Sequence, residues 1–160
     1  MHLKFLILMS YLIPVLLMIG CAASNDISNV TEYQSQDHKQ IYTQLKKERE
    51  NFNKRKKVSL ENFTDNAEIM VKYNDGKIIA SPQKLKEIWP DKIDTFNKHK
   101  LILRTIEVEN LKIQNDKAKV KTKRTYYSKR WSEYYNFKIY KVYKKVDGEW
   151  KLHKSNFQEI

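Results

Sequence analysis

The chain has 160 residues, a formal net charge of +12 and a single cysteine, Cys21. One cysteine excludes an intrachain disulfide and a zinc site built from several thiolates. The charge comes mostly from lysines spread over the whole chain, whereas nucleic-acid-binding faces gather arginines and aromatic residues. We therefore expect no nucleic-acid partner, no metal and no cofactor. Anionic lipid headgroups, wall polymers or small anionic ligands are the partners that the charge favours.

Residues 1–20 have the pattern of an export signal. Lys4 precedes the apolar segment Phe5 to Ile19, which is shorter than the roughly 20 residues of a membrane span, and Gly20 stands directly before Cys21. Leu17-Met18-Ile19-Gly20-Cys21 resembles the lipobox of bacterial lipoproteins. The resemblance implies cleavage before Cys21 and lipidation of that cysteine, and the alternatives are a plain cleaved signal or a retained anchor. It also implies a lipid anchor in the bacterial cell envelope, on the periplasmic side or at the cell surface.

Residues 21–31 are small and polar, which is typical of a tether, so we expect the folded domain to cover residues 32–160. Thr31 and Gln34 have the spacing of a capping box and predict a helix that continues to about Lys54. Its apolar residues fall on one stripe, and we interpret the charged run Lys46 to Lys57 as its solvated face. The stripe consists of Ile41, Tyr42, Leu45 and Phe52.

The middle of the chain predicts short elements separated by turns. Ser59 can cap a short helix that reaches Phe63, and Ser81-Pro82 is a typical start for a second helix, which Pro90 should end. Between these helices we expect a hairpin, since Gly76 supplies the positive φ of a tight turn. Its parts are Ala67 to Tyr73, the turn Asn74-Asp75-Gly76, and Lys77 to Ala80.

The remainder predicts β-structure. In the segment Leu101 to Gln114 the apolar residues change phase, so a bulge is expected near Glu109 or Asn110. Strict alternation follows, with lysines in the outward phase of the next strand. The three later strands are Lys117 to Tyr127, Asn136 to Val146 and Trp150 to Phe157.

This order of elements resembles the nuclear transport factor 2-like (NTF2-like) superfamily, which includes the SnoaL-like and DUF4440-like domains. The supporting residues are Leu60 to Ala67, Asp75-Gly76-Lys77 and Asp147-Gly148-Glu149-Trp150-Lys151-Leu152, and the likeness covers about Tyr33 to Glu159. The resemblance implies an α+β, cone-shaped fold in which a curved antiparallel sheet wraps two to three N-terminal helices around a concave pocket. Some members of the superfamily are enzymes and many only bind, so the fold does not fix the function.

Arg124 is the first candidate for a binding residue, because it occupies the inward phase of its strand between Thr122 and Tyr126. A buried arginine needs an anionic partner. That partner is either a carboxylate of the chain, with Glu68, Asp65 and Glu107 as candidates, or an anionic ligand at the mouth of the pocket. Aromatic residues could line the same pocket or fill the core. They are Trp89, Tyr126, Trp131, Tyr135 and Tyr140.

Three functions remain open, and no set of catalytic residues can be assigned. The first is a non-catalytic envelope lipoprotein that binds a small ligand, a wall fragment or a partner protein. The second is an isomerase or dehydratase that uses Asp65 or Glu68 as a base, which requires an inward carboxylate without a cationic neighbour. The third is a subunit that dimerises through an uncovered apolar sheet face. His153 on the last strand is expected to be a surface residue.

Overall fold

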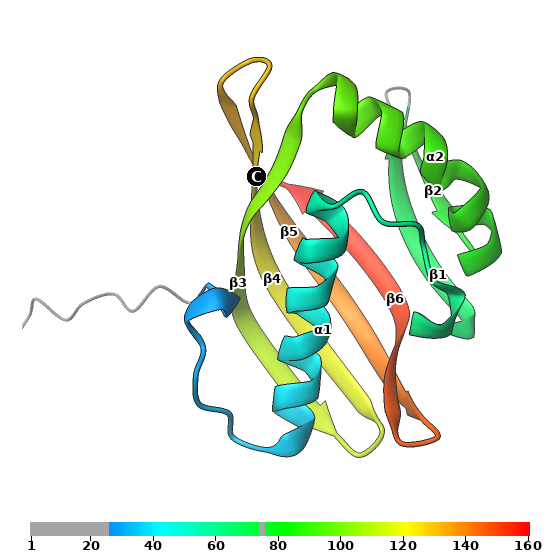
Figure 1. Ribbon diagram of the computed structural model, residues 1–160. Coiled ribbons are helices and arrows are strands. Elements are labelled where there is room, and N and C mark those ends of the chain that lie inside the picture. Colours follow the sequence, from blue (N-terminus) through cyan, green and yellow to red (C-terminus); the bar gives the residue numbers. More distant parts are fainter. Residues whose placement is uncertain (1–25, 74–75) are drawn as a thin grey trace, which may run out of the picture.

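The computed structural model describes residues 26–73 and 76–160 (Figure 1). The predicted signal segment, Cys21 and the turn residues Asn74 and Asp75 lie outside the described part of the chain. Among the described residues, no helix combines the length and apolar character that crossing a membrane requires.

Six strands form one curved sheet in the order β2-β1-β6-β5-β4-β3. Neighbouring strands are antiparallel except β1 and β6, which run parallel. The expected all-antiparallel sheet is therefore corrected to a mixed one. No hairpin joins β1 to β6, so their relative direction is not set by a local turn. The strands are β1 (Phe63–Tyr73), β2 (Gly76–Ala80), β3 (Leu101–Gln114), β4 (Lys117–Ser128), β5 (Glu133–Val146) and β6 (Glu149–Glu159).

Two long helices cover the concave side of the sheet. Helix α1 (Gln36–Asn53) lies along the sheet and packs Ile41 and Leu45 into the main core, while α2 (Pro82–Lys98) lies over β1 and β2 (Figure 1). Two short 3-10 helices, η1 (Ile27–Asn29) and η2 (Leu60–Asn62), precede α1 and β1. The expected α+β cone of a curved sheet and N-terminal helices is confirmed.

The two long helices have ends that differ from those predicted. Ser35, not Thr31, caps α1, since its Oγ accepts a hydrogen bond from the His38 amide at 3.2 Å. Helix α2 continues through Pro90 to Lys98. Phe96 in this last part packs against Phe52 and Trp89, with ring centroids 4.9 and 6.0 Å apart, and this packing offsets the helical hydrogen bond that Pro90 cannot donate.

The segment before α1 is folded on the domain from Asp26 onward. The backbone of Asp26 forms an isolated antiparallel β-bridge with Glu107 of β3. The Asp26 carboxylate accepts a hydrogen bond from the buried Ile106 amide at 3.2 Å, and the Ile27 side chain is buried in the core. The predicted tether of residues 21–31 thus includes two residues that pack on the domain, Asp26 at the edge of the sheet and Ile27 in the core. The small polar residues of this segment carry no periodic pattern that indicates such docking.

The sheet has bulges that keep the apolar residues of β3 on its concave side. The register against β4 shifts between Val108 and Asn110, as predicted, and again between Leu103 and Thr105. The first shift brings Leu111 to the same face as Ile106, although their spacing in sequence is odd.

Candidate binding site on the concave face

A buried ionic cluster lies at the centre of the concave face, under α1. Arg124 of β4 donates from Nη1 and Nη2 to the two carboxylate oxygens of Glu48 at 2.8 and 3.0 Å. Lys141 of β5 donates to the same carboxylate at 2.6 Å. The side chains of Arg124 and Lys141 are buried, while Glu48 on α1 keeps 35 % of its side chain exposed. Two cations thus share one carboxylate.

The pKa values of the three groups follow from this geometry. Burial works against the charged form of Glu48, but the two cations and their hydrogen bonds outweigh it and hold the pKa of this carboxyl far below its usual range. Burial lowers the pKa of Lys141 to about 8, with repulsion from Arg124 acting in the same direction. Arg124 stays charged, because its pairing with Glu48 raises its pKa despite burial. The cluster therefore carries an excess positive charge below the lysine pKa.

A row of aromatic rings continues from the cluster toward the C-terminal end of α1. Tyr126 of β4 lies beside Arg124 and packs edge-on against Phe52 of α1 and Phe137 of β5, with centroids 5.3 and 5.6 Å apart. Phe157 of β6 extends the row, 6.2 Å from Phe137. These rings are half-buried. They form a partly exposed apolar surface next to buried cations, which suits a ligand with an apolar body and an anionic group.

The structure brings three of the predicted binding residues to this face. Arg124 and Tyr126 are neighbours on β4, and Tyr135 is the partner of Tyr126 in register on β5. The Tyr135 hydroxyl donates to Glu133 at 2.7 Å. The partner of Arg124 is Glu48, however, and none of the three carboxylates that the sequence suggested.

The other three predicted residues do not join them. Tyr140 is the partner of Lys121 in register and points to the convex face, 41 % exposed. Trp131 lies in the β4–β5 turn, half exposed, with its ring 4.3 Å from that of His99. Trp89 on α2 donates its indole N–H to the Lys56 carbonyl at 2.9 Å. Ligand binding by any of the six remains a prediction.

Sequence reasoning missed two members of the cluster, although signals for both exist. Glu48 was included in a charged run, yet it stands three residues after Leu45 and four before Phe52, on the apolar stripe of α1. Lys141 has the same phase as Ile139 and Tyr143 on β5. Each is a charged residue at a position where the periodicity of its helix or strand expects an apolar one. Two such residues of opposite charge, on elements that face each other, indicate a buried ion pair.

The carboxylates considered as catalytic bases lie elsewhere. Asp65 is exposed, and exposed Glu68 pairs with Lys154 at 2.9 Å, which lowers the pKa of Glu68. His153 sits at a register shift between β5 and β6, where its Nδ1 lies 2.9 Å from the Thr64 hydroxyl. Burial lowers its pKa, and nearby Lys144 acts in the same direction. Among the described residues, no group of three or more His, Cys, Asp or Glu side chains could hold a metal ion.

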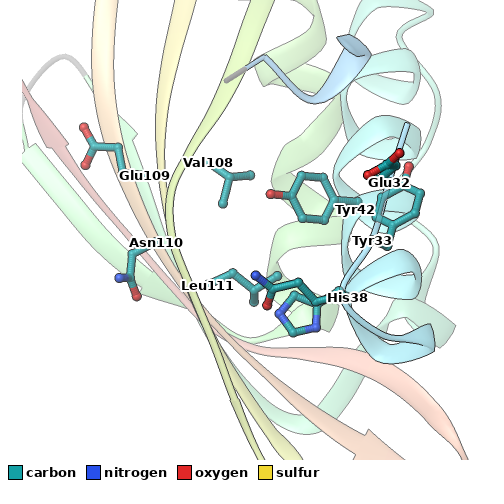
Figure 2. A pocket seen from close by; sticks show the side chains of 9 residues that line it. Glu32, Tyr33, His38, Tyr42, Val108, Glu109, Asn110 and Leu111 are labelled. Carbon is teal, nitrogen blue, oxygen red and sulfur yellow. The ribbon is translucent and has the colours of Figure 1, made fainter. Parts of the chain in front are cut away.

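A separate hollow of about 340 Å³ lies between the start of α1 and the bulge of β3 (Figure 2). In Figure 2, Tyr42 and Val108 point toward each other across it, whereas Glu109 and Asn110 point away. The Tyr33 hydroxyl near its rim donates to the Val30 carbonyl at 3.2 Å. The hollow contains none of the six predicted binding residues.

Comparison with known proteins supports the fold. No protein-family model matches the chain, and no curated protein matches it. An NTF2-like protein of unknown function from Silicibacter pomeroyi is similar in structure, with a TM-score of 0.57 and 10% identity over 81% of this chain and 100% of that one. An NTF2-like protein from Cytophaga hutchinsonii has a TM-score of 0.55 and 18% sequence identity, over 79% of this chain and 100% of that one.

A third solved structure is described by a different fold name. A domain of unknown function with a cystatin-like fold from Nostoc punctiforme gives a TM-score of 0.66 and 13% identity, over 80% of each chain. At such low identity, similarity in structure establishes the fold alone. The order of strands and helices and these likenesses together show that the chain has the NTF2-like fold.

Proposed function

We propose that this protein is a non-catalytic binding domain, anchored in the bacterial cell envelope by a lipid on Cys21. In this proposal the concave face binds a ligand that carries a carboxylate or phosphate, such as a small metabolite or a wall fragment. The observation that carries the proposal is the ionic imbalance there, where buried Arg124 and Lys141 share the single carboxylate of Glu48. Buried charge is costly unless it is compensated, so an anionic group would be stabilised beside them.

The same cluster makes proton abstraction a poor alternative. A general base works best with a pKa near the operating pH and close to its substrate. Glu48 is held far below that range by its two cations, and Glu68 is exposed and paired with Lys154. The geometry therefore favours binding over isomerase or dehydratase chemistry.

The aromatic row supports an amphipathic ligand over a bare ion. Tyr126, Phe137 and Phe157 are half-buried next to the cluster, and Lys77 of β2 lies 5.3 Å from the Phe157 ring. A sugar or peptide bearing a carboxylate could lie on these rings while its charge meets Arg124 and Lys141. A protein partner with an acidic side chain between apolar ones would use the same surface.

Thermal denaturation of the purified full chain with muramyl dipeptide or glycerol 3-phosphate tests ligand binding. A bound ligand raises the melting temperature. We expect a shift with wild type that Lys141→Met reduces, because this variant keeps the Glu48–Arg124 pair but removes the excess charge. Lys138→Met, on the opposite face of β5, is the matched control and should keep the shift. Equal shifts in both variants would contradict binding at the cluster.

The anchor requires its own experiment, because Cys21 lies outside the described residues. Cells expressing wild type or Cys21→Ser are fractionated into membranes and soluble extract. We expect wild type in the membranes and a loss of lipid labelling in the variant. Wild-type protein without lipid label would refute the lipoprotein assignment while leaving the concave binding site untouched.

A further inference from the structure

The convex face of the sheet is covered with lysines. Alternate residues of β4 point to this side, and their partners in register on β3, β5 and β6 point there too. We call this surface the lysine face. It comprises Lys112, Lys117, Lys119, Lys121, Lys123, Lys138, Lys144, Lys151 and Lys154.

Several of these lysines stand directly opposite one another on neighbouring strands. Lys117 pairs with Lys144, which pairs with Lys151, so three strands contribute one continuous row of like charge. Lys123 and Lys138 form a second such pair, and Lys112 and Lys119 a third. Like charges in direct cross-strand register destabilise a sheet. The lysine face therefore carries electrostatic repulsion that destabilises the sheet and contributes nothing to its folding.

Acidic side chains compensate only part of this repulsion, mainly near β3, where Glu107 is the partner of Lys123 in register. Glu109 pairs with Lys121 at 2.8 Å and Glu68 with Lys154 at 2.9 Å. Within residues 26–73 and 76–160, no ion pair is formed by Lys117, Lys144 or Lys151. A second copy of the chain would bring the same charge, so self-association through this face is unfavourable. An anionic partner would relieve the repulsion.

We infer that the lysine face docks on the anionic headgroups of a lipid bilayer. Besides charge, the position of Asp26, the first described residue, supports this partner, an argument that rests on the proposed lipid at Cys21. Asp26 is fixed at the β3 edge of the sheet, and Cys21 precedes it by five residues, a reach of at most about 18 Å. A domain held so close keeps its charged surfaces near the membrane, where attraction extends over about 8–10 Å.

Aromatic side chains at the end of this face fit a bilayer interface. Tyr134, 62 % exposed, packs on Tyr127 with centroids 4.8 Å apart, and Arg104 lies 5.4 Å from the Tyr127 ring. The β4–β5 hairpin that carries Tyr134 extends beyond the sheet at the top of Figure 1 and ends in half-exposed Trp131. Tyrosine and tryptophan favour the headgroup region, where basic side chains also gain from anionic lipid.

The test measures lysine reactivity on vesicles. Full-length protein purified from membranes is mixed with vesicles of phosphatidylcholine alone or with one-third phosphatidylglycerol, and an amine-reactive reagent labels exposed lysines for mass spectrometry. We expect Lys117, Lys144 and Lys151 to lose reactivity with phosphatidylglycerol only, and to regain it at high salt. Lys84 and Lys86 on α2 should react equally in both.

Lys144→Glu separates docking from folding. The substitution replaces two repulsive contacts by attractive ones, so the variant should be more stable than wild type in urea. Its retention on phosphatidylglycerol vesicles beyond that on phosphatidylcholine should nonetheless fall about tenfold or more. Lys86→Glu, at an exposed position of α2, makes the same change of net charge and should retain docking.

The outcomes that overturn the inference are distinct from failure of the anchor. Equal protection on both vesicle types, protection of Lys84 and Lys86 instead, or equal losses in Lys144→Glu and Lys86→Glu would each refute docking by the lysine face. Protection by soluble polyphosphate but not by vesicles would assign the face to a soluble polyanion instead. A chain that does not sediment with phosphatidylcholine, yet is protected by phosphatidylglycerol, lacks the lipid anchor but keeps the docking face.

Discussion

Glu48 holds two cations in place, and the three side chains are not equally replaceable. Glu48→Gln leaves Arg124 and Lys141 without a carboxylate partner. Breaking a buried ion pair in this way lowers the free energy of unfolding by about 3 kcal/mol or more. We expect about 3 kcal/mol here, because Glu48 is partly exposed. Lys141→Met leaves a neutral Glu48–Arg124 pair, so we expect a change within about 1 kcal/mol. Urea denaturation of both variants measures these differences. A larger loss in Lys141→Met would mean that the lysine, not the arginine, is the main partner.

The same residues make stability depend on pH in two windows. The folded pKa of Glu48 lies below its unfolded value, so its contribution is present above about pH 4.3 and is lost as the pH falls further. Burial lowers the pKa of Lys141 to about 8 in the folded chain, whereas an unfolded lysine has a pKa of about 10.4. Between these two values Lys141 is protonated in the unfolded chain and largely neutral in the folded one. Stability should therefore rise across this upper window.

The urea midpoint measured against pH tests both signs. Lys141→Met should abolish the alkaline rise and keep the acid loss. Glu48→Gln should reduce the acid loss but not remove it, because lysine partners also lower the pKa values of Asp37, Glu68 and Glu109. Lys138→Met serves as the control, since Lys138 lies on the convex face of the same strand. An alkaline rise that persists in Lys141→Met would assign it to another group.

Arg124 could be identified from sequence because its strand alternates cleanly, with a lysine at each outward position that precedes it. Tyr140 could not be placed, since both phases of β5 contain aromatic and apolar residues, and only pairing with β4 decides which faces α1. Glu48 was hidden by the charges around it. Burial of a charge depends on a partner from another element, which local periodicity does not reveal.

Among the elements, α2 departs furthest from its predicted extent. Its interior Pro90 lacks an amide hydrogen, and the helix persists because residues beyond it pack on the domain. Pro90→Ala should restore a helical hydrogen bond and stabilise the protein by about 1–3 kcal/mol, reduced by the greater freedom of the unfolded chain. Thermal denaturation should show a higher melting temperature. A lower one would indicate that the proline ring itself contributes to packing.

The segment at the β3 edge is a second element with a measurable role. The Asp26 carboxylate accepts the buried Ile106 amide and lies 3.4 Å from Arg49. Asp26→Ala leaves that amide without its acceptor, which costs about 1–3 kcal/mol. Hydrogen exchange should show faster exchange at Ile106 in this variant, with amides in the centre of β5 as the internal control. Unchanged exchange at Ile106 would place its protection in the neighbouring strands.

At the scale of the whole molecule, the order of elements and the bulge near Glu109 were predictable, because alternation and turn residues are local signals. The parallel pairing of β1 with β6 was not, since it joins segments far apart in sequence without a connecting turn. The lysines of β4 were expected to face water, and they do lie on the convex side. Their alignment with lysines of β3, β5 and β6 emerges only from the register of four strands.

In the lipoprotein that we propose, burial of Ile27 so near Cys21 also constrains the order of maturation. An enzyme that acylates a cysteine and cuts the bond before it must grip several residues of extended chain around that site. Once Ile27 is buried in the core, few residues separate the folded domain from Cys21, so the enzyme has little extended chain to bind. Processing would then precede closure of the domain, and the last step of folding would take place with the acyl chains already inserted.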